Sequence, residues 1–175
     1  VIDFRETAPA ASTYEFYERF LKNDGKDLTD EFATSGEGVA IPGEVAGLLT
    51  ALEKYGTMTR AQAIQPSLDL EKSGITVTAS FANLLKKHKY RLEQFQSSRD
   101  TWFNDQGNLY QKGDKWHNPG FAKTLMLIAK KGMEGFYTGE LANAIVHATN
   151  NSGGILSLED LSGYSVKIRK PIRGN

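Results

Sequence analysis

The sequence predicts an α+β fold whose middle part is mostly helical. Strand-like apolar segments lie near both ends, at residues 1–4 (VIDF) and 166–172 (VKIRKPI). Between them, apolar residues recur at helical spacing in segments that glycine and proline separate. We expect one partial domain over residues 1–175 with no internal boundary. Its terminal strands are expected to belong to a larger sheet whose other strands lie outside this sequence.

The composition indicates a folded protein without net charge. Hydrophobic residues make up 39% of the chain and charged residues 24%, which argues against disorder. The 21 basic side chains are balanced by 21 acidic ones, so a general nucleic-acid or membrane-surface binder, which needs a basic excess, is not expected. The lack of cysteine excludes disulfides, thiolate chemistry and cysteine-based metal sites in this sequence.

The two ends of the sequence are expected to be boundaries within a longer chain. The sequence begins with Val1 rather than methionine, no signal peptide is recognisable there, and the last strand is cut off at residues 174–175. No apolar run approaches the roughly 20 residues that span a bilayer. Any targeting segment is therefore expected outside these residues.

Two helices are predicted in the first half of the chain. The first begins after the break at residues 42–43 (PG) and ends at Gly56. Thr59 and Gln62 form a capping-box signature that begins the second helix, which ends near Gly74. The apolar face of the first contains Val45, Leu48, Leu49 and Leu52, and that of the second contains Ala63, Ile64, Leu68 and Leu70.

A third helix with a strongly solvated face is predicted from Leu84, Leu85 and the basic run at residues 86–91 (KKHKYR). Residues 98–118 are predicted to be irregular because turn signals interrupt them. The turn signals are residues 104–107 (NDQG) and 112–114 (KGD), and a short hairpin is expected between residues 102–103 and 109–110.

The last third of the chain contains three further helix signals. Residues 118–119 (NP) supply an N-cap and a proline at the first helical position, and Gly132 or Gly135 ends that helix. The next helix is closed by residues 151–154 (NSGG), and residues 157–160 (SLED) form another capping signature. The apolar positions of the first two helices are Phe121, Leu125 and Ile128, and then Leu141, Ala144, Ile145 and Ala148.

No short catalytic motif is present: the sequence contains no HExxH, Walker or GxSxG pattern. His88, His117 and His147 are far apart and lack a ligand partner at i+4, so we interpret them as structural. Residues 36–38 (GEG) lack the third glycine and the βαβ unit of a dinucleotide loop. Acidic residues near turns are interpreted as solvated rather than as a catalytic pair; they are Asp3, Glu6, Asp27, Asp30 and Glu31. We expect no metal and no cofactor.

Arg5 is the most promising candidate for ligand binding. It follows an apolar strand-like start and precedes a proline-containing loop, a position from which side chains often face ligands. A guanidinium group binds a carboxylate through two parallel hydrogen bonds in a fixed plane. The alternative is a surface ion pair between Arg5 and Asp3 or Glu6, and the residues alone leave both interpretations open.

Six motifs occur in an order that resembles one known family. They are residues 3–11 (DFRETAPAA), 39–47 (VAIPGEVAG), 54–56 (KYG), 65–68 (QPSL) with Gly74, 136–139 (FYTG) and 153–164 (GGILSLEDLSGY). The chain is similar to part of the large subunit of γ-glutamyltransferases (γ-glutamyl transpeptidases), with Ile41 where valine is usual. The likeness spans almost the whole chain, and six motifs in order are far more specific than any one alone.

The resemblance implies the helix-rich portion of an N-terminal nucleophile hydrolase (αββα) fold. Proteins of this family are made as precursors that cleave themselves into a large and a small subunit. The freed N-terminal threonine of the small subunit attacks the γ-glutamyl amide of glutathione or a related donor, with its own α-amine as general base. The glutamyl group then passes to water, an amino acid or a peptide.

The resemblance assigns no catalytic residue to this chain, because the threonine nucleophile belongs to the small subunit. It implies that Arg5 holds the α-carboxylate of the γ-glutamyl group and that Glu6 orients Arg5 or the loop. The Pro42-Gly43 and Phe136-Tyr137 motifs are interpreted as a helix start and a packing anchor. The partners implied are the small subunit of the same precursor and a γ-glutamyl donor such as glutathione; no nucleic acid is expected.

Two alternatives stay open for the function. The chain could belong to a catalytically silent relative, or to an acylase of the same superfamily that acts on other amides and need not hold an α-carboxylate. The resemblance also implies an exported protein, located in the periplasm, secreted or on the outer face of the plasma membrane. Asn150 begins a glycosylation sequon, Asn150-Asn151-Ser152, to which we give little weight.

Overall fold

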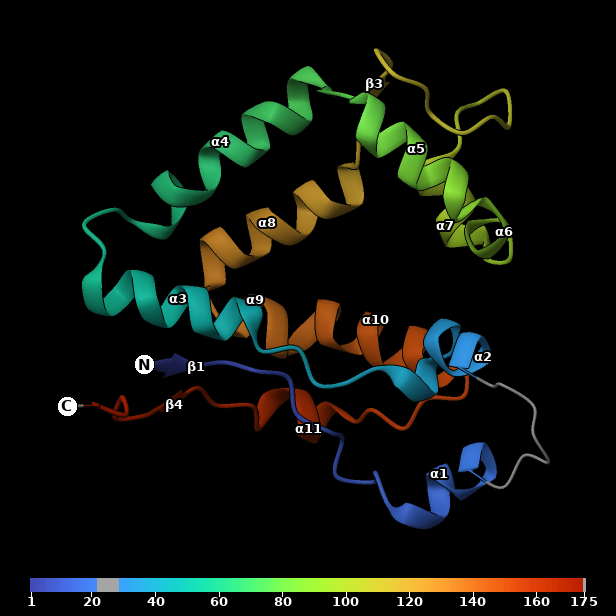
Figure 1. The fold of residues 1–175 in the computed structure, drawn as a ribbon. Coiled ribbons are helices and arrows are strands. Elements are labelled where there is room, and N and C mark those ends of the chain that lie inside the picture. The colour runs from blue at the N-terminus through green and yellow to red at the C-terminus, as the bar shows by residue number, and fades with distance from the viewer. Residues whose placement is uncertain (22–28, 175) are drawn as a thin grey trace. The chain divides into compact units, whose positions relative to one another are not determined.

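The computed structural model describes residues 1–21 and 29–174 (Figure 1). Their contacts group into two units, one formed by Val1–Ala61 with Leu127–Asn175 and the other by Gln62–Met126. Each unit is described by itself, and the absence of an internal domain boundary stays a prediction. Within the described residues, no helix is both long and apolar enough to cross a membrane.

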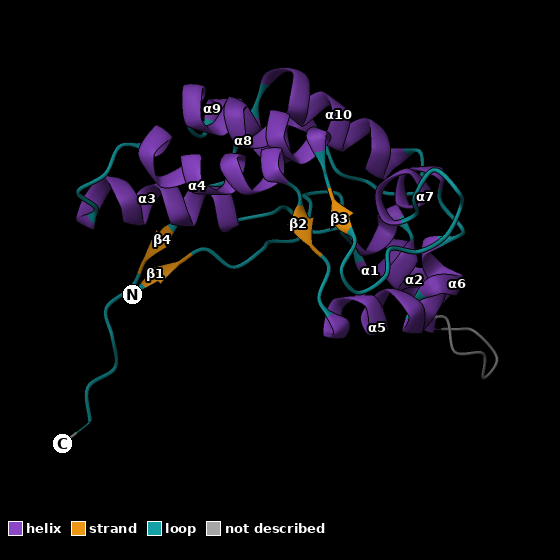
Figure 2. Ribbon diagram, turned by 90° about the horizontal axis from the view of Figure 1, so that it is seen from above, coloured by secondary structure: helices purple, strands orange, loops and turns teal. Residues whose placement is uncertain are grey.

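Both predicted end segments form strands of the first unit, although each strand is short. β1 (Ile2–Asp3) pairs antiparallel with β4 (Lys167–Ile168), and Ile2 lies opposite Ile168 (Figures 1 and 2). The backbone N–H of Arg169 also donates to the Val1 carbonyl at 3.0 Å. The two ends of the sequence are therefore joined side by side, and the chain leaves β1 directly into the loop that contains Arg5.

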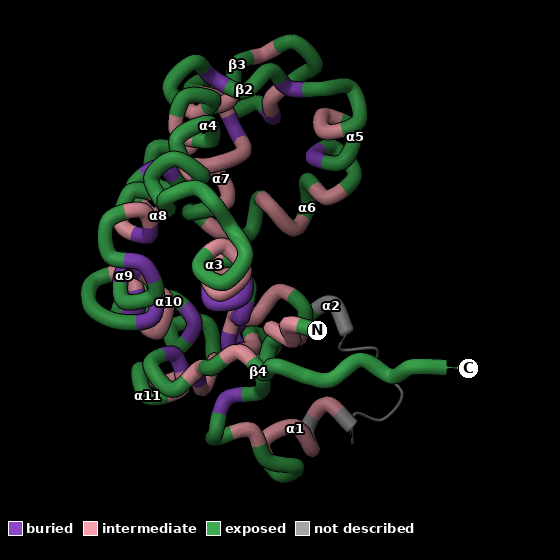
Figure 3. Tube along the Cα trace, turned by 90° about the vertical axis from the view of Figure 1, so that its left-hand side faces the viewer, coloured by how far each residue is buried: buried purple, intermediate pink, exposed green. Residues whose placement is uncertain are grey.

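The helices of the first unit pack around a small apolar core. Its helical elements are α1 (Tyr14–Leu21), α2 (Thr29–Thr34), the 3₁₀ turn η1 (Gly36–Gly38), α3 (Glu44–Tyr55), α9 (Glu134–Tyr137), α10 (Gly139–Asn150) and α11 (Leu158–Ser162). Figure 3 shows buried stretches in α9 and α10. The core residues are Ile41, Ala46, Tyr137, Ala142, Leu156 and Leu161. Two of these core residues contact the Arg5 loop or its support: Ile41 pairs with Thr7, and Tyr137 stacks on Tyr164.

Three helices of this unit follow the sequence prediction. α3 begins after Pro42-Gly43 and is capped at its C-terminal end by Gly56, whose N–H donates to the Leu52 carbonyl at 2.8 Å. α10 ends where predicted, but Ala144 and Ala148 of its predicted apolar face are exposed, and Ala142 lies in the core instead. α11 has the predicted capping box, in which Ser157 and Asp160 bond each other's side chains and backbone. The capping signals therefore place the helix starts correctly.

α1 and α2 were not predicted, and aromatic packing explains their formation. The rings of Phe20 and Phe32 meet edge to face with centroids 5.1 Å apart, and Tyr17 contacts Phe32 at 5.8 Å. Ring contacts between two short helices stabilise elements that neither helix would form alone. No capping signature or periodic run in the sequence indicates this pairing.

The second unit contains a separate core and a second strand pair. Its elements are α4 (Arg60–Ser73), β2 (Ile75–Thr76), α5 (Ala79–Lys87), α6 (Lys89–Leu92), α7 (Gln96–Trp102), β3 (Lys115–Trp116) and α8 (Pro119–Lys131), with the first residues of α4 and the last of α8 in the first unit. β2 and β3 pair antiparallel, with Ile75 opposite Trp116. Leu85, Phe103 and Leu109 form the core. α4 and α8 form where they were predicted, but Leu70 of the predicted apolar face of α4 and Phe121 of that of α8 are exposed.

Two predictions for this unit need correction. The expected third helix is broken at His88, which adopts φ −104° and ψ 14° and separates α5 from α6. Residues 98–118 are not wholly irregular, because α7 continues to Trp102 and β3 pairs with β2. The expected hairpin is present in reduced form as an antiparallel bridge between Phe103 and Leu109.

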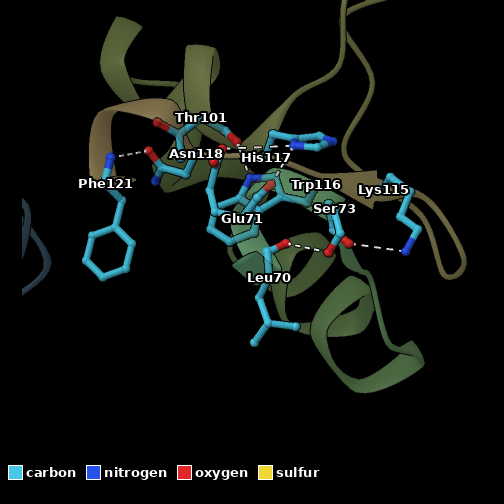
Figure 4. A network of polar contacts seen from close by, with 10 residues as sticks. Leu70, Glu71, Ser73, Thr101, Lys115, Trp116, His117, Asn118 and Phe121 are labelled. Carbon is cyan, nitrogen blue, oxygen red and sulfur yellow. Dashed lines mark hydrogen bonds and ion pairs between the residues drawn. The ribbon is translucent and has the colours of Figure 1, made fainter. Parts of the chain in front are cut away.

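Polar contacts tie the elements of the second unit together (Figure 4). The Trp116 indole N–H donates to the Thr101 carbonyl at 2.9 Å, and Lys115 Nζ donates to the Gly74 carbonyl at 3.1 Å. Asn118 Oδ1 accepts from the Phe121 N–H at 2.9 Å, which confirms the predicted N-cap of α8. The first two bonds connect β3 to α7 and to the residue that follows α4, the third caps α8, and all three serve a structural purpose.

Candidate functional site

Arg5 lies in a groove on the first unit, immediately after β1. The groove has a volume of about 620 Å³ and is lined by residues 1–6 together with Pro42, Gly43, Glu44 and Arg169. The Arg5 side chain is 82% exposed, so its guanidinium is accessible from solution. β1, the start of α3 and the end of β4 therefore meet at one position, and the only predicted ligand-binding arginine lies there.

Both backbone polar groups of Arg5 are hydrogen-bonded. Its N–H donates to Asp3 Oδ1 at 3.2 Å, and its carbonyl accepts from the Tyr164 hydroxyl at 2.8 Å. The other Asp3 oxygen accepts a hydrogen bond from Arg169 of the segment after β4. This bond, followed by the one from the Arg5 N–H, lowers the pKa of Asp3 below its usual value. The peptide on each side of Arg5 is thus fixed while its side chain is free to reach a ligand.

The rest of the loop is held at two further points. Thr7 and Ile41 form an antiparallel bridge with N–H to carbonyl distances of 3.3 and 2.8 Å. The Ala10 N–H donates to Asp160 Oδ1 at 2.8 Å, while Asp160 Oδ2 accepts from the Ser157 N–H and hydroxyl at 3.0 and 2.9 Å. The loop from Arg5 to Ala10 is therefore restrained at both ends and near its middle.

Two stacked tyrosines connect this loop to the core. The rings of Tyr137 and Tyr164 are nearly parallel, with an interplanar angle of 6° and centroids 5.8 Å apart. The Tyr137 hydroxyl donates to the Pro42 carbonyl at 2.7 Å and accepts from the Ala46 N–H at 3.2 Å. Burial raises the pKa of Tyr137 above its usual value. These contacts agree with the interpretation of Phe136-Tyr137 as a packing anchor and of Pro42-Gly43 as the start of a helix.

Glu6 is the immediate neighbour of the Arg5 guanidinium. Arg5 Nη2 donates to Glu6 Oε1 at 2.6 Å, and among the described residues Glu6 is its only side-chain partner. Both groups are more than half exposed, so this pair adds little to stability. A guanidinium carries five N–H donors, so most of them stay available for a carboxylate while Glu6 occupies one.

The histidines have local partners and do not cluster. His117 Nδ1 lies 2.8 Å from the Glu71 carbonyl (Figure 4), and Asn151 Nδ2 lies 3.2 Å from His147 Nδ1. His88 forms the junction of α5 and α6. Within residues 1–21 and 29–174, no group of three or more metal-ligating side chains comes together.

The remaining predicted positions lie away from the groove or outside the described residues. Asn150, which begins the sequon, donates from Nδ2 to the Leu156 carbonyl at 3.1 Å, so a glycan on this nitrogen would compete with that bond. Glycosylation there stays a prediction. Asp27 lies outside the described residues, and Glu31 is exposed on α2.

Arg5 thus combines an exposed guanidinium with a restrained backbone, in a helix-rich α+β fold. The family model described as Gamma-glutamyltranspeptidase matches residues 1–175, and the chain belongs to this family. A "Glutathione hydrolase proenzyme" from Pseudomonas sp. (strain A14) is 34% identical over 171 residues, which cover 98% of this chain and 29% of that protein. An "Acylase ACY 1 proenzyme" from Pseudomonas sp. (strain V22) is 32% identical, and the matched residues cover 100% of this chain and 32% of that protein.

The solved structures agree with this assignment. The Helicobacter pylori gamma-glutamyltranspeptidase matches with a TM-score of 0.91 and 35% identity, over 99% of this chain and 49% of that one. The predicted fold class, a helix-rich portion of an N-terminal nucleophile hydrolase, is confirmed. The chain spans about three-tenths of the length of the curated relatives it matches, and those relatives are named as proenzymes.

Sequence reasoning missed the positioning contacts of Tyr164 and Asp160. Tyr164 was recognised only within a motif, and Asp160 only as a helix cap. Their partners Arg5 and Ala10 lie 159 and 150 residues away in the chain, so no local pattern reveals the contacts.

Proposed function

We propose that the complete protein is a γ-glutamyltransferase that cleaves the γ-glutamyl amide of glutathione and related donors. The glutamyl group passes to water, an amino acid or a peptide. Family membership and the relatives named glutathione hydrolase proenzymes support this proposal. In it, this chain supplies scaffold and substrate binding, and the N-terminal threonine of the small subunit of the same precursor is the nucleophile.

The observation that carries the proposal is the contrast within Arg5 between a fixed backbone and an exposed guanidinium. Both peptide groups are bonded, whereas the side chain is 82% exposed in a groove. A donor α-carboxylate would bind two parallel N–H groups, a charge-assisted arrangement with a defined plane. Preorganisation of the loop lowers the entropy lost on binding. Glu6 orients the guanidinium through its hydrogen bond with Arg5 Nη2.

Arg5→Ala in the full-length protein tests this role. Loss of a bound charge pair costs about 2–5 kcal/mol, so the KM for a γ-glutamyl donor is expected to rise by about 30-fold or more. Arg5→Lys keeps the charge but loses the two-pronged geometry, so its KM is expected to lie between those of the wild type and the alanine variant. Steady-state kinetics with glutathione measure both, and gel electrophoresis of the subunits measures self-cleavage.

Arg91→Ala, which removes an arginine of α6, is the matched control and is expected to leave the KM unchanged. Self-cleavage is expected to proceed in all three variants, since Arg5 acts on the donor. Glu6→Gln is expected to raise the KM less than Arg5→Ala and to have no further effect in the Arg5→Ala background. An unchanged donor KM in Arg5→Ala contradicts the assignment.

The main alternative is an acylase that acts on other amides, favoured by the 32% identity to an acylase proenzyme. An amide substrate without an α-carboxylate would not need Arg5. If the full-length protein hydrolyses such an amide and Arg5→Ala leaves this activity intact, the acylase assignment is correct. A full-length protein that neither cleaves itself nor turns over any amide would be a silent relative.

The resemblance to exported enzymes leads us to propose that the protein works outside the cytosol. In this location the protein encounters glutathione and its breakdown products in the periplasm or outside the cell. Fractionation of cells that express the full-length protein tests this location, and recovery only in the cytosolic fraction contradicts it.

A further inference from the structure

We infer that Tyr164 is a positioning residue for the donor-binding arginine, because its hydroxyl holds the Arg5 carbonyl and so fixes the direction in which the guanidinium leaves the loop. The inference rests on the proposed function of Arg5. Tyr164 and Asp160 act on the two ends of the same loop, at Arg5 and at Ala10. Asp160 of α11 and Tyr164, two residues after it, therefore form a clip on the binding loop.

The position of Tyr164 is determined by the core. Its ring stacks on Tyr137, which is only 5% exposed. Tyr137 is in turn bonded through its hydroxyl to the Pro42 carbonyl and the Ala46 N–H at the start of α3. A chain of contacts thus leads from a buried ring to the Arg5 carbonyl, which makes the hydroxyl a fixed donor rather than a mobile surface group.

The space around the hydroxyl is shaped by a glycine. A Cβ at Gly43 would lie 2.0 Å from the Tyr164 hydroxyl oxygen and 2.1 Å from the Phe4 carbonyl oxygen. A Cβ at Gly47, one turn later, would lie 2.1 Å from the Phe4 ring. Real Cβ atoms do not approach other atoms this closely, so α3 has no side chain where the hydroxyl and the strand end are seated. This close approach is independent evidence that the fold is shaped to seat the Tyr164 hydroxyl beside the Arg5 carbonyl.

The hydroxyl keeps its proton under ordinary conditions. Burial raises the pKa of Tyr164 above its usual value, and the negative charges of Asp3 and Glu6 raise it further. The phenol is therefore a donor to the Arg5 carbonyl at neutral pH. Because the other Arg5 peptide group is bound by Asp3, removal of the Tyr164 donor releases one of two restraints and leaves the N–H bond in place.

The expected effect is on donor binding and not on chemistry. Tyr164 contacts the backbone of the binding residue, so its loss widens the range of guanidinium positions. One hydrogen bond of this kind corresponds to about a three- to tenfold change in an equilibrium constant. A purely structural residue would instead lower the amount of self-cleaved protein or change kcat and KM in every background.

Tyr164→Phe in the full-length protein, alone and with Arg5→Ala, is the test. The single variant is expected to raise the KM for glutathione about three- to tenfold with kcat within twofold of wild type. In the Arg5→Ala background the same substitution is expected to change the KM by less than twofold. Tyr55→Phe at the exposed end of α3 is the matched control and is expected to change nothing. Replacement of Tyr164 by 4-aminophenylalanine, which restores a donor, is expected to recover the wild-type KM.

The outcomes separate this inference from the proposed function. If Arg5→Ala raises the KM and Tyr164→Phe does not, the inference about Tyr164 is overturned and the function stands. If Arg5→Ala has no effect, the proposed function fails and the inference with it. An equal effect of Tyr164→Phe in both backgrounds overturns the inference, because the residue would then act independently of Arg5. If the phenylalanine variant does not fold, the 4-aminophenylalanine variant decides: a KM like wild type supports the inference, and a raised KM overturns it.

Discussion

The two peptide groups of Arg5 are bonded to Asp3 and Tyr164, whereas its guanidinium contacts only Glu6 among the described side chains. A fixed backbone with an accessible side chain suits a binding residue, since the fixed backbone limits the entropy lost when the side chain binds a ligand. Asp3, considered from the sequence as a solvated carboxylate or an ion-pair partner of Arg5, instead accepts hydrogen bonds from the Arg5 N–H and from Arg169.

Tyr137→Phe is expected to destabilise the protein by about 1–3 kcal/mol, because it removes the acceptor of the buried Ala46 N–H and the donor to the Pro42 carbonyl. A lower denaturation temperature of the full-length protein measures the effect. Tyr14→Phe is a matched control, since Tyr14 is 63% exposed and its substitution should leave the temperature unchanged. Equal denaturation temperatures for Tyr137→Phe and wild type would show that the Tyr137 hydroxyl is dispensable.

Asp160 makes the stability of the loop clip dependent on pH. Burial opposes its ionisation, but hydrogen bonds from the Ala10 N–H and from Ser157 outweigh burial and lower its pKa. A carboxyl with a lowered folded-state pKa stabilises the fold above its unfolded pKa, near 4, and this contribution is lost as the pH falls through the folded value. The wild type is therefore expected to lose stability on acidification below about pH 4.

Denaturation temperatures between pH 3 and pH 7 test this dependence. Asp160→Asn is expected to be less stable than wild type at pH 7 and to show a shallower decline at acidic pH, because no carboxylate is lost. Asp105→Asn, at an exposed turn, is expected to keep the wild-type slope. If wild type and Asp160→Asn show parallel profiles, Asp160 does not contribute to the acid dependence.

At the level of elements, capping and turn residues predict the ends of helices well, whereas the predicted apolar faces are only partly buried. α3, α4, α8, α10 and α11 all begin or end at residues that the sequence marks. β1 and β4 were predicted only as longer segments, and β2 and β3 were not predicted, because two-residue strands show no alternation of side chains. The break at His88 was missed, since neither glycine nor proline marks it, and tertiary contacts decide where such a helix ends.

The sequence was sufficient to propose a candidate site at Arg5 and Glu6 but not to find its supporting residues. The Arg5 position follows from a strand end and a proline-containing loop, both of which are local features. Tyr164 and Asp160 reach the loop from more than a hundred residues away. Such contacts depend on how β1 and β4 pair and how α11 packs on the core, and local spacing carries no information about either.

Considered as a whole, the chain divides its roles between two units. Every residue of the candidate site belongs to the first unit, which also holds β1, β4, α3 and α11. The second unit has its own small core of Leu85, Phe103 and Leu109 and a network of polar contacts between its elements. In the proposed function, donor binding therefore falls to the first unit and a scaffold role to the second.

The 175 residues alone are expected to release no γ-glutamyl group from glutathione. Binding by Arg5 orients a donor but does not attack it, and every threonine in this sequence has its α-amine in a peptide bond. A free α-amine is what allows an N-terminal threonine to act as nucleophile and base together. Incubation of the purified chain with glutathione, followed by an assay for glutamate and transfer products, measures this. The full-length protein under the same conditions is the positive control and should form both. Turnover by the purified chain would place a nucleophile within these residues and contradict the assignment of the chemistry to the small subunit.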